Sequence, residues 1–229
     1  MDSSKIKEIN NILFWIGHAS FYIKTKETTL FIDPFNVDSN IVKERADLVL
    51  ITHAHFDHCS RADLFKIIKP DGKIISSQGC LTKRDYNNLE IIKPGYNGKF
   101  NDISISAIPA YNLKSERLSF HPRENEWVGY IIDAAGLRFY HAGDTDFIPE
   151  MKKLKGLDVA MLPVGGTYTM DVDEAIEAAK SIDSKFIVPM HYKNLLGVDG
   201  SKKAEEKLKK GLNNLLIMNE VQKPTYAFK

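Results

Sequence analysis

Short apolar runs rich in β-branched residues alternate with polar turns along most of the chain. Runs of this length predict strands, because a buried helix or a membrane span would need a longer apolar pattern. The expected strands cover 12–16, 20–24, 28–32, 47–51, 73–76, 103–108, 127–132, 137–140, 157–163 and 185–191.

Three segments have helix signals instead. Residues 62–68 show helical spacing that ends at a Pro-Asp-Gly turn. Residues 175–181 follow the capping-box pattern Asp171-x-x-Glu174, so we take these two carboxylates as structural. The last helix, 201–210, mixes Lys and Glu as a solvent-exposed helix does. Strands that alternate with helices predict an α/β fold with right-handed crossovers.

Polar clusters stand where several of these strands end. The run 47–51 leads directly into Thr52-His53-Ala54-His55-Phe56-Asp57-His58, and other strands end at Asp33, at His141-Ala142-Gly143-Asp144 and at His191. Open α/β sheets bind their ligands at the carboxyl ends of their strands. We therefore expect these side chains to meet at one edge of the fold.

The densest cluster has the composition of a metal site. His53 and His55 lie two residues apart, so an extended turn can bring both imidazoles to one ion. Asp57 and His58 can turn to a second ion nearby. Imidazole and carboxylate together suit zinc, manganese or iron. The competing interpretation is a solvated turn rich in histidine.

Composition narrows the class of protein. With 229 residues, 43% of them hydrophobic and 27% charged, the chain fits one domain, 1–229. A formal charge of +1 gives no electrostatic reason for nucleic acid or an acidic membrane as the main partner. We expect a small-molecule substrate, while a homo-oligomer stays open.

The two cysteines and the first residues bear on the compartment. Cys59 and Cys80 do not form a disulfide framework or a Cys-x-x-Cys pair, and Cys59 is predicted to be a packing residue. The first residues lack the apolar core of a signal peptide, and no apolar run approaches the roughly 20 residues of a membrane helix. These features predict a cytoplasmic protein.

The order of the polar motifs resembles that of the metallo-β-lactamase-fold hydrolases. The set comprises Asp33, His53-x-His55-x-Asp57-His58, Gly143-Asp144 and His191, and it spans nearly the whole chain. The phrases 140–145 and 188–192 look like the branch that includes ascorbate-6-phosphate lactonase-like enzymes. The resemblance implies an αβ/βα sandwich, in which two mixed sheets pack face to face with helices outside.

The resemblance also implies a role for each motif residue. His53 and His55 would hold a first metal, Asp57, His58 and His191 a second, and Asp144 would bridge them. Outside these ligands, Asp33 would orient a ligand imidazole, His141 would be a neighbour, and His18 would be either a pocket wall or a turn residue. Two divalent ions are implied, zinc before manganese or iron.

One departure from the family pattern concerns the first metal. The family adds a third histidine from a strand end in the region 107–113, where this chain has Ile108-Pro109-Ala110-Tyr111-Asn112. His121 from the long loop 111–126 is the favoured substitute. Tyr111 is another candidate, although its phenol pKa of about 10 would have to fall strongly. The third alternative is a metal held by fewer protein groups.

The chemistry that this resemblance implies is hydrolysis. A metal-bound water with its pKa lowered from about 15.7 to about 7 provides a hydroxide that attacks a small ester, lactone or phosphodiester. Asp57 would orient the nucleophile and accept its proton, and His121, His18 and Tyr111 are candidates for the acid. Loops 36–46, 111–126 and 165–170 would build the pocket, with Tyr168 either lining it or forming a turn.

Two other functions compete with a hydrolase. A non-catalytic member of the same fold would bind a metal or ligand, and the missing third histidine supports it. A diiron redox protein is the other alternative, but that branch has an acid where His55 stands.

Overall fold

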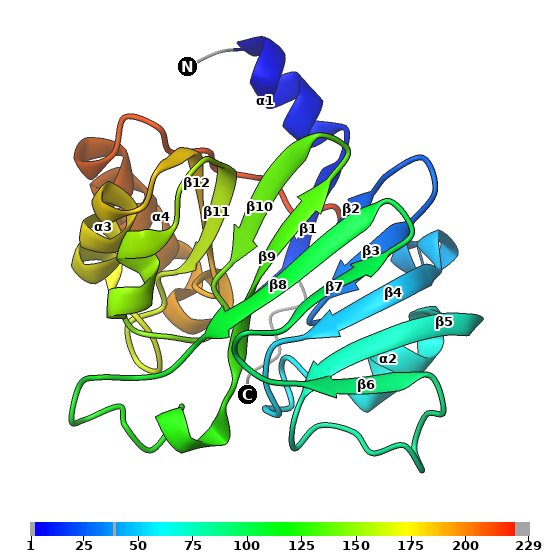
Figure 1. Ribbon diagram of the computed structural model, residues 1–229. Helices are drawn as coiled ribbons and strands as arrows, with labels where there is room; N and C mark the ends of the chain where they lie inside the picture. Colours follow the sequence, from blue (N-terminus) through cyan, green and yellow to red (C-terminus); the bar gives the residue numbers. More distant parts are fainter. Residues whose placement is uncertain (1–2, 39, 223–229) are drawn as a thin grey trace.

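Two six-stranded sheets face each other in the computed structural model, which describes residues 3–38 and 40–222 (Figure 1). The first sheet has the order β1 (Leu13–Gly17), β2 (Ser20–Lys24), β3 (Thr29–Ile32), β4 (Ala46–Ile51), β5 (Ile68–Ser77) and β6 (Leu89–Ile92). The second has the order β12 (Ser184–Met190), β11 (Leu157–Pro163), β10 (Leu137–His141), β9 (Val128–Ala134), β8 (Ile103–Pro109) and β7 (Asn97–Phe100).

Both sheets are mixed. In the first sheet, β1, β2 and β3 are antiparallel, whereas β3 to β6 are parallel. In the second, β10, β11 and β12 are parallel, whereas β7 to β10 are antiparallel. The α/β sandwich of two mixed sheets that the resemblance implied is therefore confirmed.

The helices lie on the outer faces. Helix α2 (Arg61–Ile67) lies beside β4 and β5, and α3 (Val172–Ser181) and α4 (Lys193–Gly211) lie beside β11 and β12 (Figure 1). Helix α1 (Ser3–Asn10) precedes β1, and short 3-10 turns occupy Ile41–Glu44, Arg123–Asn125 and Pro149–Lys153. Among the described residues, no helix is long and apolar enough to cross a membrane.

The period of two along each strand separates the two apolar layers. Leu48 and Leu50 of β4 belong to the large core between the sheets, whereas Val49 and Ile51 belong to a smaller core under α2. Because both faces of β4 are covered in this way, the strand is apolar from Leu48 to Ile51 without a polar alternation. Tyr130 of β9 joins the two sheets, since its hydroxyl donates to the Ile51 carbonyl over 2.9 Å.

Element boundaries differ from the sequence expectation in a few places. Helix α1 was not predicted, and α4 begins at Lys193, before the expected 201, with a non-helical Gly197 inside it. Strand β5 starts at Ile68 and runs through the Pro-Asp-Gly segment that was expected to be a turn. The ladder with β4 pairs Ile68 and then Lys73, so the Pro-Asp-Gly segment forms an irregular bulge between two paired parts of the strand.

The prediction for the cysteines was wrong. Cys59 and Cys80 form a disulfide, with their Cα atoms 5.9 Å apart and a sequence separation of 21. Cys59 also belongs to the small core, as expected of a packing residue. Sequence spacing could not reveal the pair, because β5 and the following turn bring the two residues together. The disulfide ties the segment after His58 to the loop after β5.

Because the disulfide closes a loop of 21 residues, Cys59→Ser combined with Cys80→Ser should lower the free energy of unfolding by about 3 kcal/mol. Urea unfolding of the wild-type protein with and without dithiothreitol measures the same difference. The double variant serves as the control, since a reductant should leave its midpoint unchanged. Equal midpoints for oxidised and reduced wild type would contradict a stabilising disulfide.

Candidate metal centre

The candidate site lies where strands of both sheets end. Asp33 follows β3, Thr52 and His53 follow β4, Asp144 follows β10, and His191 follows β12. His18 occupies the turn between β1 and β2. Three residues of this set adopt left-handed backbone angles, with φ of 51° at His18, 45° at Asp33 and 58° at His191. Such conformations are uncommon for residues with a side chain, and they gather at functional sites.

A tight turn presents the histidine motif. The His55 carbonyl accepts backbone N–H bonds from His58 at 3.0 Å and from Cys59 at 2.7 Å, so the chain folds back after Phe56. Ser60 then caps α2 by accepting from the Asp63 N–H. The motif is therefore held between the end of β4 and the start of α2, with all four of its ligand-type side chains in one turn.

The first group of potential ligands joins the motif to the long loop. One ligand atom from each of His53, His55 and His121 lies within 4.8 Å of the others. His53 Nε2 is 3.1 Å from His55 Nδ1, and the ring centroids of His53 and His121 are 5.0 Å apart. The structure thus places His121, at 1% exposure, beside His53 and His55, although this chain lacks the third histidine of the family pattern.

The second group combines His18, Asp57, His58 and His191, again with one ligand atom from each within 4.8 Å of the others. His18 Nε2 is 3.0 Å from Asp57 Oδ2, and His191 Nε2 is 3.9 Å from the same oxygen. His18 is therefore either a ligand or the group that orients Asp57, and it is more than a turn residue.

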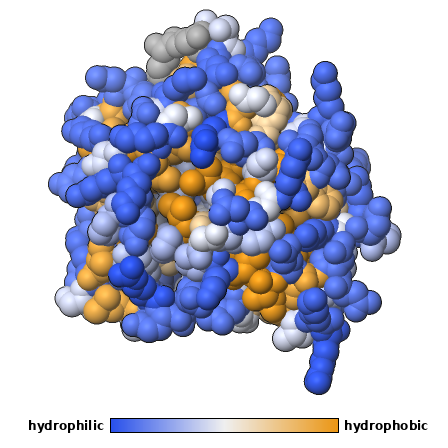
Figure 2. Space-filling view, in the orientation of Figure 1, coloured by the Kyte–Doolittle hydropathy of each residue, from blue (hydrophilic) through white to orange (hydrophobic). Residues whose placement is uncertain are grey.

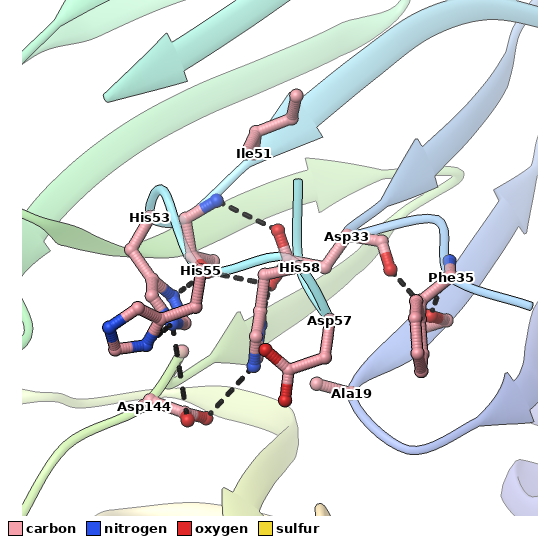
Figure 3. A network of polar contacts seen from close by, with 12 residues as sticks. Ala19, Asp33, Phe35, Ile51, His53, His55, Asp57, His58 and Asp144 are labelled. Atoms are coloured by element: carbon pink, nitrogen blue, oxygen red, sulfur yellow. Dashed lines mark hydrogen bonds and ion pairs between the residues drawn. The ribbon is translucent and has the colours of Figure 1, made fainter. Parts of the chain in front are cut away.

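Asp144 lies between the two groups. Its Oδ2 is 3.0 Å from His191 Nε2 and 3.4 Å from His121 Nε2, and its Oδ1 is 3.4 Å from His58 Nε2. Figure 3 shows Asp144 facing the histidines from the side opposite Asp33. A carboxylate with its two oxygens placed this way can contact two cations at once.

Gly143 lets Asp144 reach this position. Its φ is +66°, and a Cβ there would lie 2.9 Å from the Val128 carbonyl oxygen and 3.2 Å from the Thr52 Cβ. Only glycine combines that backbone conformation with so close an approach. The Gly-Asp sequence is therefore required by the packing of β10 against the histidine motif.

Asp33 orients two of the imidazoles. It is fully buried and accepts from His58 Nδ1 at 2.7 Å, from the Thr52 N–H at 2.8 Å and from the Thr52 hydroxyl at 2.6 Å (Figure 3). The Thr52 oxygen in turn accepts from His53 Nδ1 at 2.9 Å. These bonds engage Nδ1 of each ring, so Nε2 is the nitrogen of His53 and of His58 that would face a metal.

His121 is oriented in the same manner by Asn112. The His121 Nδ1–H donates to Asn112 Oδ1 at 2.8 Å, and Asn112 Nδ2 donates to Asp146 Oδ1 at 3.0 Å. The backbone N–H of Asn112 also donates to the His121 carbonyl at 2.9 Å. Because Asn112 binds both the ring and the backbone of His121, it fixes the ring with Nε2 toward Asp144.

Arg117 anchors this loop from behind. Its guanidinium, buried to 3% exposure, lies 3.0 Å from Asp146 Oδ1 and 2.8 Å from Glu174 Oε1, and it donates to the Thr169 carbonyl. Glu174 also completes the predicted capping box with Asp171. Burial would raise the pKa of Glu174, but Arg117 and Lys114 lower it to about 2.

Arg117→Met should therefore loosen His121. We expect the free energy of unfolding to fall by about 3–5 kcal/mol, because Asp146 would lose its buried cation. Metal affinity should fall by about 10–100-fold, as for other groups that orient a ligand. Urea unfolding and calorimetric metal titration measure the two effects. Arg123→Met is the matched control, since Arg123 is 67% exposed and pairs with Glu150 at 3.4 Å. Unchanged metal affinity in Arg117→Met would contradict the positioning role.

The charges of the site favour a cation at its centre. Burial lowers the pKa of His53 well below its usual range and that of His18 to about 4, so both rings are neutral at neutral pH, as metal binding requires. Burial would also lower the pKa of His58, but Asp144 and Asp33 raise it well above its usual range. Burial would raise the pKa of Asp144, yet His191 and His58 hold it well below normal.

Hydrogen bonding supports a metal as well. Several buried atoms of the candidate ligands make no hydrogen bond within the described part of the chain, and among them are His58 Nε2, His121 Nε2, His191 Nε2 and Asp144 Oδ1. Buried polar atoms normally have a partner, and an ion is one explanation when they do not. All four face the same small volume, so these residues fit divalent cations.

Tyr111 and His141, which the sequence analysis also named as site residues, lie outside both groups of potential ligands. The Tyr111 hydroxyl donates to Glu150 Oε2 at 3.0 Å, and its ring packs under Arg123 at 4.8 Å. Burial and Glu150 raise its pKa, the opposite of what a phenolate ligand or acid at this site requires. His141 donates from Nε2 to the Ala19 carbonyl at 2.8 Å and accepts the Gly143 N–H at Nδ1, so both its nitrogens are used.

A pocket of about 350 Å³ opens onto the centre. It is lined by His55, Phe56, Asp57, Phe120, His121, Asp144, Tyr168, His191 and Leu195. Two of the loops expected to build a pocket, 111–126 and 165–170, contribute to it, whereas 36–46 contributes no lining residue. Tyr168 lines the pocket and was expected to do so or to form a turn.

The comparisons with known proteins agree with this geometry. Residues 12–191 match the model of the beta-lactamase superfamily domain. The chain is 35% identical over 225 residues to a UPF0173 metal-dependent hydrolase of Thermoplasma volcanium, covering 93% of this chain and 97% of that protein. The corresponding protein of Thermoplasma acidophilum is 32% identical over 225 residues, covering 93% and 96%.

Solved structures of metal-dependent hydrolases are also similar to this chain. A candidate metal-dependent hydrolase of Parabacteroides distasonis has a TM-score of 0.79 at 33% identity, covering 92% of this chain and 93% of that one. Igni18, a metallo hydrolase of Ignicoccus hospitalis, has a TM-score of 0.70 at 25% identity, covering 95% and 98%. The chain therefore belongs to the UPF0173 metal-dependent hydrolases, a family with the metallo-β-lactamase fold.

Proposed function

We propose that this metal-dependent hydrolase works with two divalent ions, most suitably zinc, on a small ester, lactone or phosphodiester. The observation that carries the proposal is the position of Asp144, whose carboxylate lies between two separate groups of potential ligands. His53, His55 and His121 would hold one ion, and Asp57, His58 and His191, with His18 beside them, the other. Asp144 would be shared.

When bound, such a pair of ions supplies a hydroxide nucleophile at neutral pH and polarises the oxygen under attack. The protein's own residues arrange the rest. His18 holds Asp57 Oδ2 at 3.0 Å, and Asp57 lines the pocket, so its carboxylate can orient the attacking water and accept a proton. Asp33 and Asn112 keep the imidazoles in the tautomer that binds a metal.

Metal content and turnover together test this proposal. We expect two equivalents of metal per chain by elemental analysis, loss of turnover in a chelator, and recovery on adding zinc or manganese. Trp127 offers an independent signal, because its ring lies 5.0 Å from those of both His53 and His55. Binding of Co²⁺ should quench its fluorescence, and Trp127→Phe should abolish that quenching while the fluorescence of Trp15 remains.

The outcomes separate the alternatives. No bound metal after reconstitution would overturn the proposal. Bound metal without turnover of esters, lactones or phosphodiesters would favour a metal-binding or ligand-binding role instead. The similarity of the motifs to the ascorbate-6-phosphate lactonase-like branch stays a prediction, and a phosphorylated lactone in the substrate panel tests it.

A further inference from the structure

The side of the pocket that faces away from the metal centre is apolar. Five of its lining residues belong to the candidate metal centre, and the other four are Phe56, Phe120, Tyr168 and Leu195. These four come from the histidine motif, from the loop 111–126, from the loop 165–170 and from helix α4. Separate segments thus converge on the mouth of the site, with Tyr168 offering the one polar atom among these four side chains.

The aromatic residues are held by other rings. Phe120 and Tyr168 pack edge to face with centroids 4.8 Å apart, and Phe56 packs in the same way on Phe35 at 5.9 Å. Phe56 is nevertheless 66% exposed and Tyr168 38%. Large side chains that stay partly exposed while their neighbours hold them in place mark a surface that gains burial when an apolar group binds.

Cations do not reach this surface. None of the lining residues, all within the described part of the chain, is Lys or Arg. The basic side chains of the adjoining loop 111–126 form ion pairs with acidic residues outside the pocket lining. Lys114 pairs with Glu174 at 2.6 Å, Arg117 with Asp146 and Glu174, and Arg123 with Glu150. Hydrophilic side chains cover most of the visible face, and apolar groups show between them in the centre and at the lower right (Figure 2).

A charged substituent placed against these four side chains would therefore lose hydration without gaining a charged partner from them. An uncharged apolar substituent would gain contact with the two aromatic pairs. A pocket of about 350 Å³ is at the lower end of the range for small-molecule sites. It suits a compact group, of the size of a short acyl chain or a small ring.

We infer that the substrate is an uncharged carboxylic ester or lactone whose acyl group or ring is apolar, and that Phe56, Phe120 and Tyr168 bind that group. The inference rests on the proposed function and narrows it, because it disfavours phosphodiesters and substrates with a carboxylate. In the reaction, water adds its oxygen to the carbonyl carbon, the bond from that carbon to the leaving oxygen breaks, and the leaving oxygen takes up a proton. The products are a carboxylate, an alcohol and a released proton, and for a lactone the carboxylate and the alcohol belong to one molecule.

Matched p-nitrophenyl substrates test the inference on the metal-loaded full chain. From acetate through butyrate to pentanoate, kcat/KM should rise by about fourfold per methylene group. The pentanoate should exceed the hemisuccinate, which is of similar size but carries a carboxylate, by at least about tenfold. The kcat/KM for the pentanoate should exceed that for bis(p-nitrophenyl) phosphate, which has the same leaving group, by a still larger factor.

A pair of variants locates the effect. Phe120→Ala should remove most of the dependence on chain length, whereas Leu118→Ala, at an apolar residue of the same loop that does not line the pocket, should retain it. Phe120→Gln, which keeps a side chain of intermediate length but removes the apolar ring, replaces the alanine variant if that one fails to fold. A retained dependence on chain length in a folded Phe120 variant would overturn the assignment of the wall.

Calorimetry provides a readout that does not depend on turnover. We expect 2-hexanone, a neutral analogue that cannot be hydrolysed, to bind the metal-loaded protein more tightly than dimethyl phosphate does. Tighter binding of dimethyl phosphate, or faster turnover of the phosphodiester or the hemisuccinate than of the pentanoate, would overturn this inference and leave the proposed hydrolase standing. Failure to bind metal would overturn the proposed function itself.

Discussion

Asp144→Asn should lower kcat/KM by about 1,000-fold or more and reduce the bound metal from two ions to at most one. The substitution keeps the shape of the side chain and removes its charge. Asp144 is 4% exposed, and its oxygens lie within 3.4 Å of the Nε2 atoms of His58, His121 and His191. An amide would present an N–H donor where one of the two cations requires an oxygen ligand.

Elemental analysis, the Trp127 quenching titration and steady-state kinetics measure this effect. Asp133→Asn is the matched control, because Asp133 lies on the neighbouring strand β9 with a side chain 48% exposed. That control should retain both metals and full activity. If Asp144→Asn kept two metals with wild-type affinity, Asp144 would not be the shared ligand, and the two ligand groups would have to bind their ions independently.

Sequence could predict that most of the candidate ligands lie close together, because they follow strands, whereas His121 comes from the long loop. His53, His55, Asp57 and His58 are close in sequence, and the apolar run before them is unambiguous. Asp144 and His191 also follow strands, so the fold determines that they meet. The same logic applies to Asp33, which stands at the end of β3 and accepts from His58.

Residues that orient a candidate ligand could not be identified from the sequence in the same way. Asn112, Asp146 and Arg117 orient His121 through contacts between loops, and nothing in their spacing identifies them. The Gly-Asp-Thr-Asp run was a partial clue, since Asp146 lies two residues after the shared carboxylate. The Cys59–Cys80 disulfide escaped prediction for the same reason, because only the packing of β5 against β4 brings the cysteines together.

The apolar pocket illustrates a third limit of sequence reasoning. Phe56 stands inside the metal motif, where its neighbours are ligands, yet its own side chain faces the pocket and packs on Phe35. Phe120 precedes a candidate ligand in the same manner. In both cases a candidate ligand and an apolar pocket residue are neighbours in sequence, so the motif that identifies the candidate metal centre also contains part of the pocket lining.

The second large effect is expected at His121, the candidate substitute for the third histidine of the family pattern. His121→Ala should reduce the bound metal from two ions to one and lower kcat/KM by at least about 100-fold. The His121 Nε2 is 3.4 Å from Asp144 Oδ2 and makes no hydrogen bond within the described residues, while its Nδ1–H is held by Asn112. A ring that is buried and oriented in this way leaves one lone pair for an ion, and alanine removes it.

Tyr111→Phe is the comparison that decides between the two candidates of the long loop. Its hydroxyl donates to Glu150, so the phenylalanine variant should keep two metals and activity within about twofold of wild type. Loss of a metal in Tyr111→Phe, together with two metals retained in His121→Ala, would reverse the assignment. Loss in neither variant would mean that His53 and His55 hold the first ion with fewer protein ligands. The expected pattern, loss in His121→Ala alone, would make the loop that carries His121 a part of the metal centre, and would explain why Arg117 and Asn112 hold that loop so firmly.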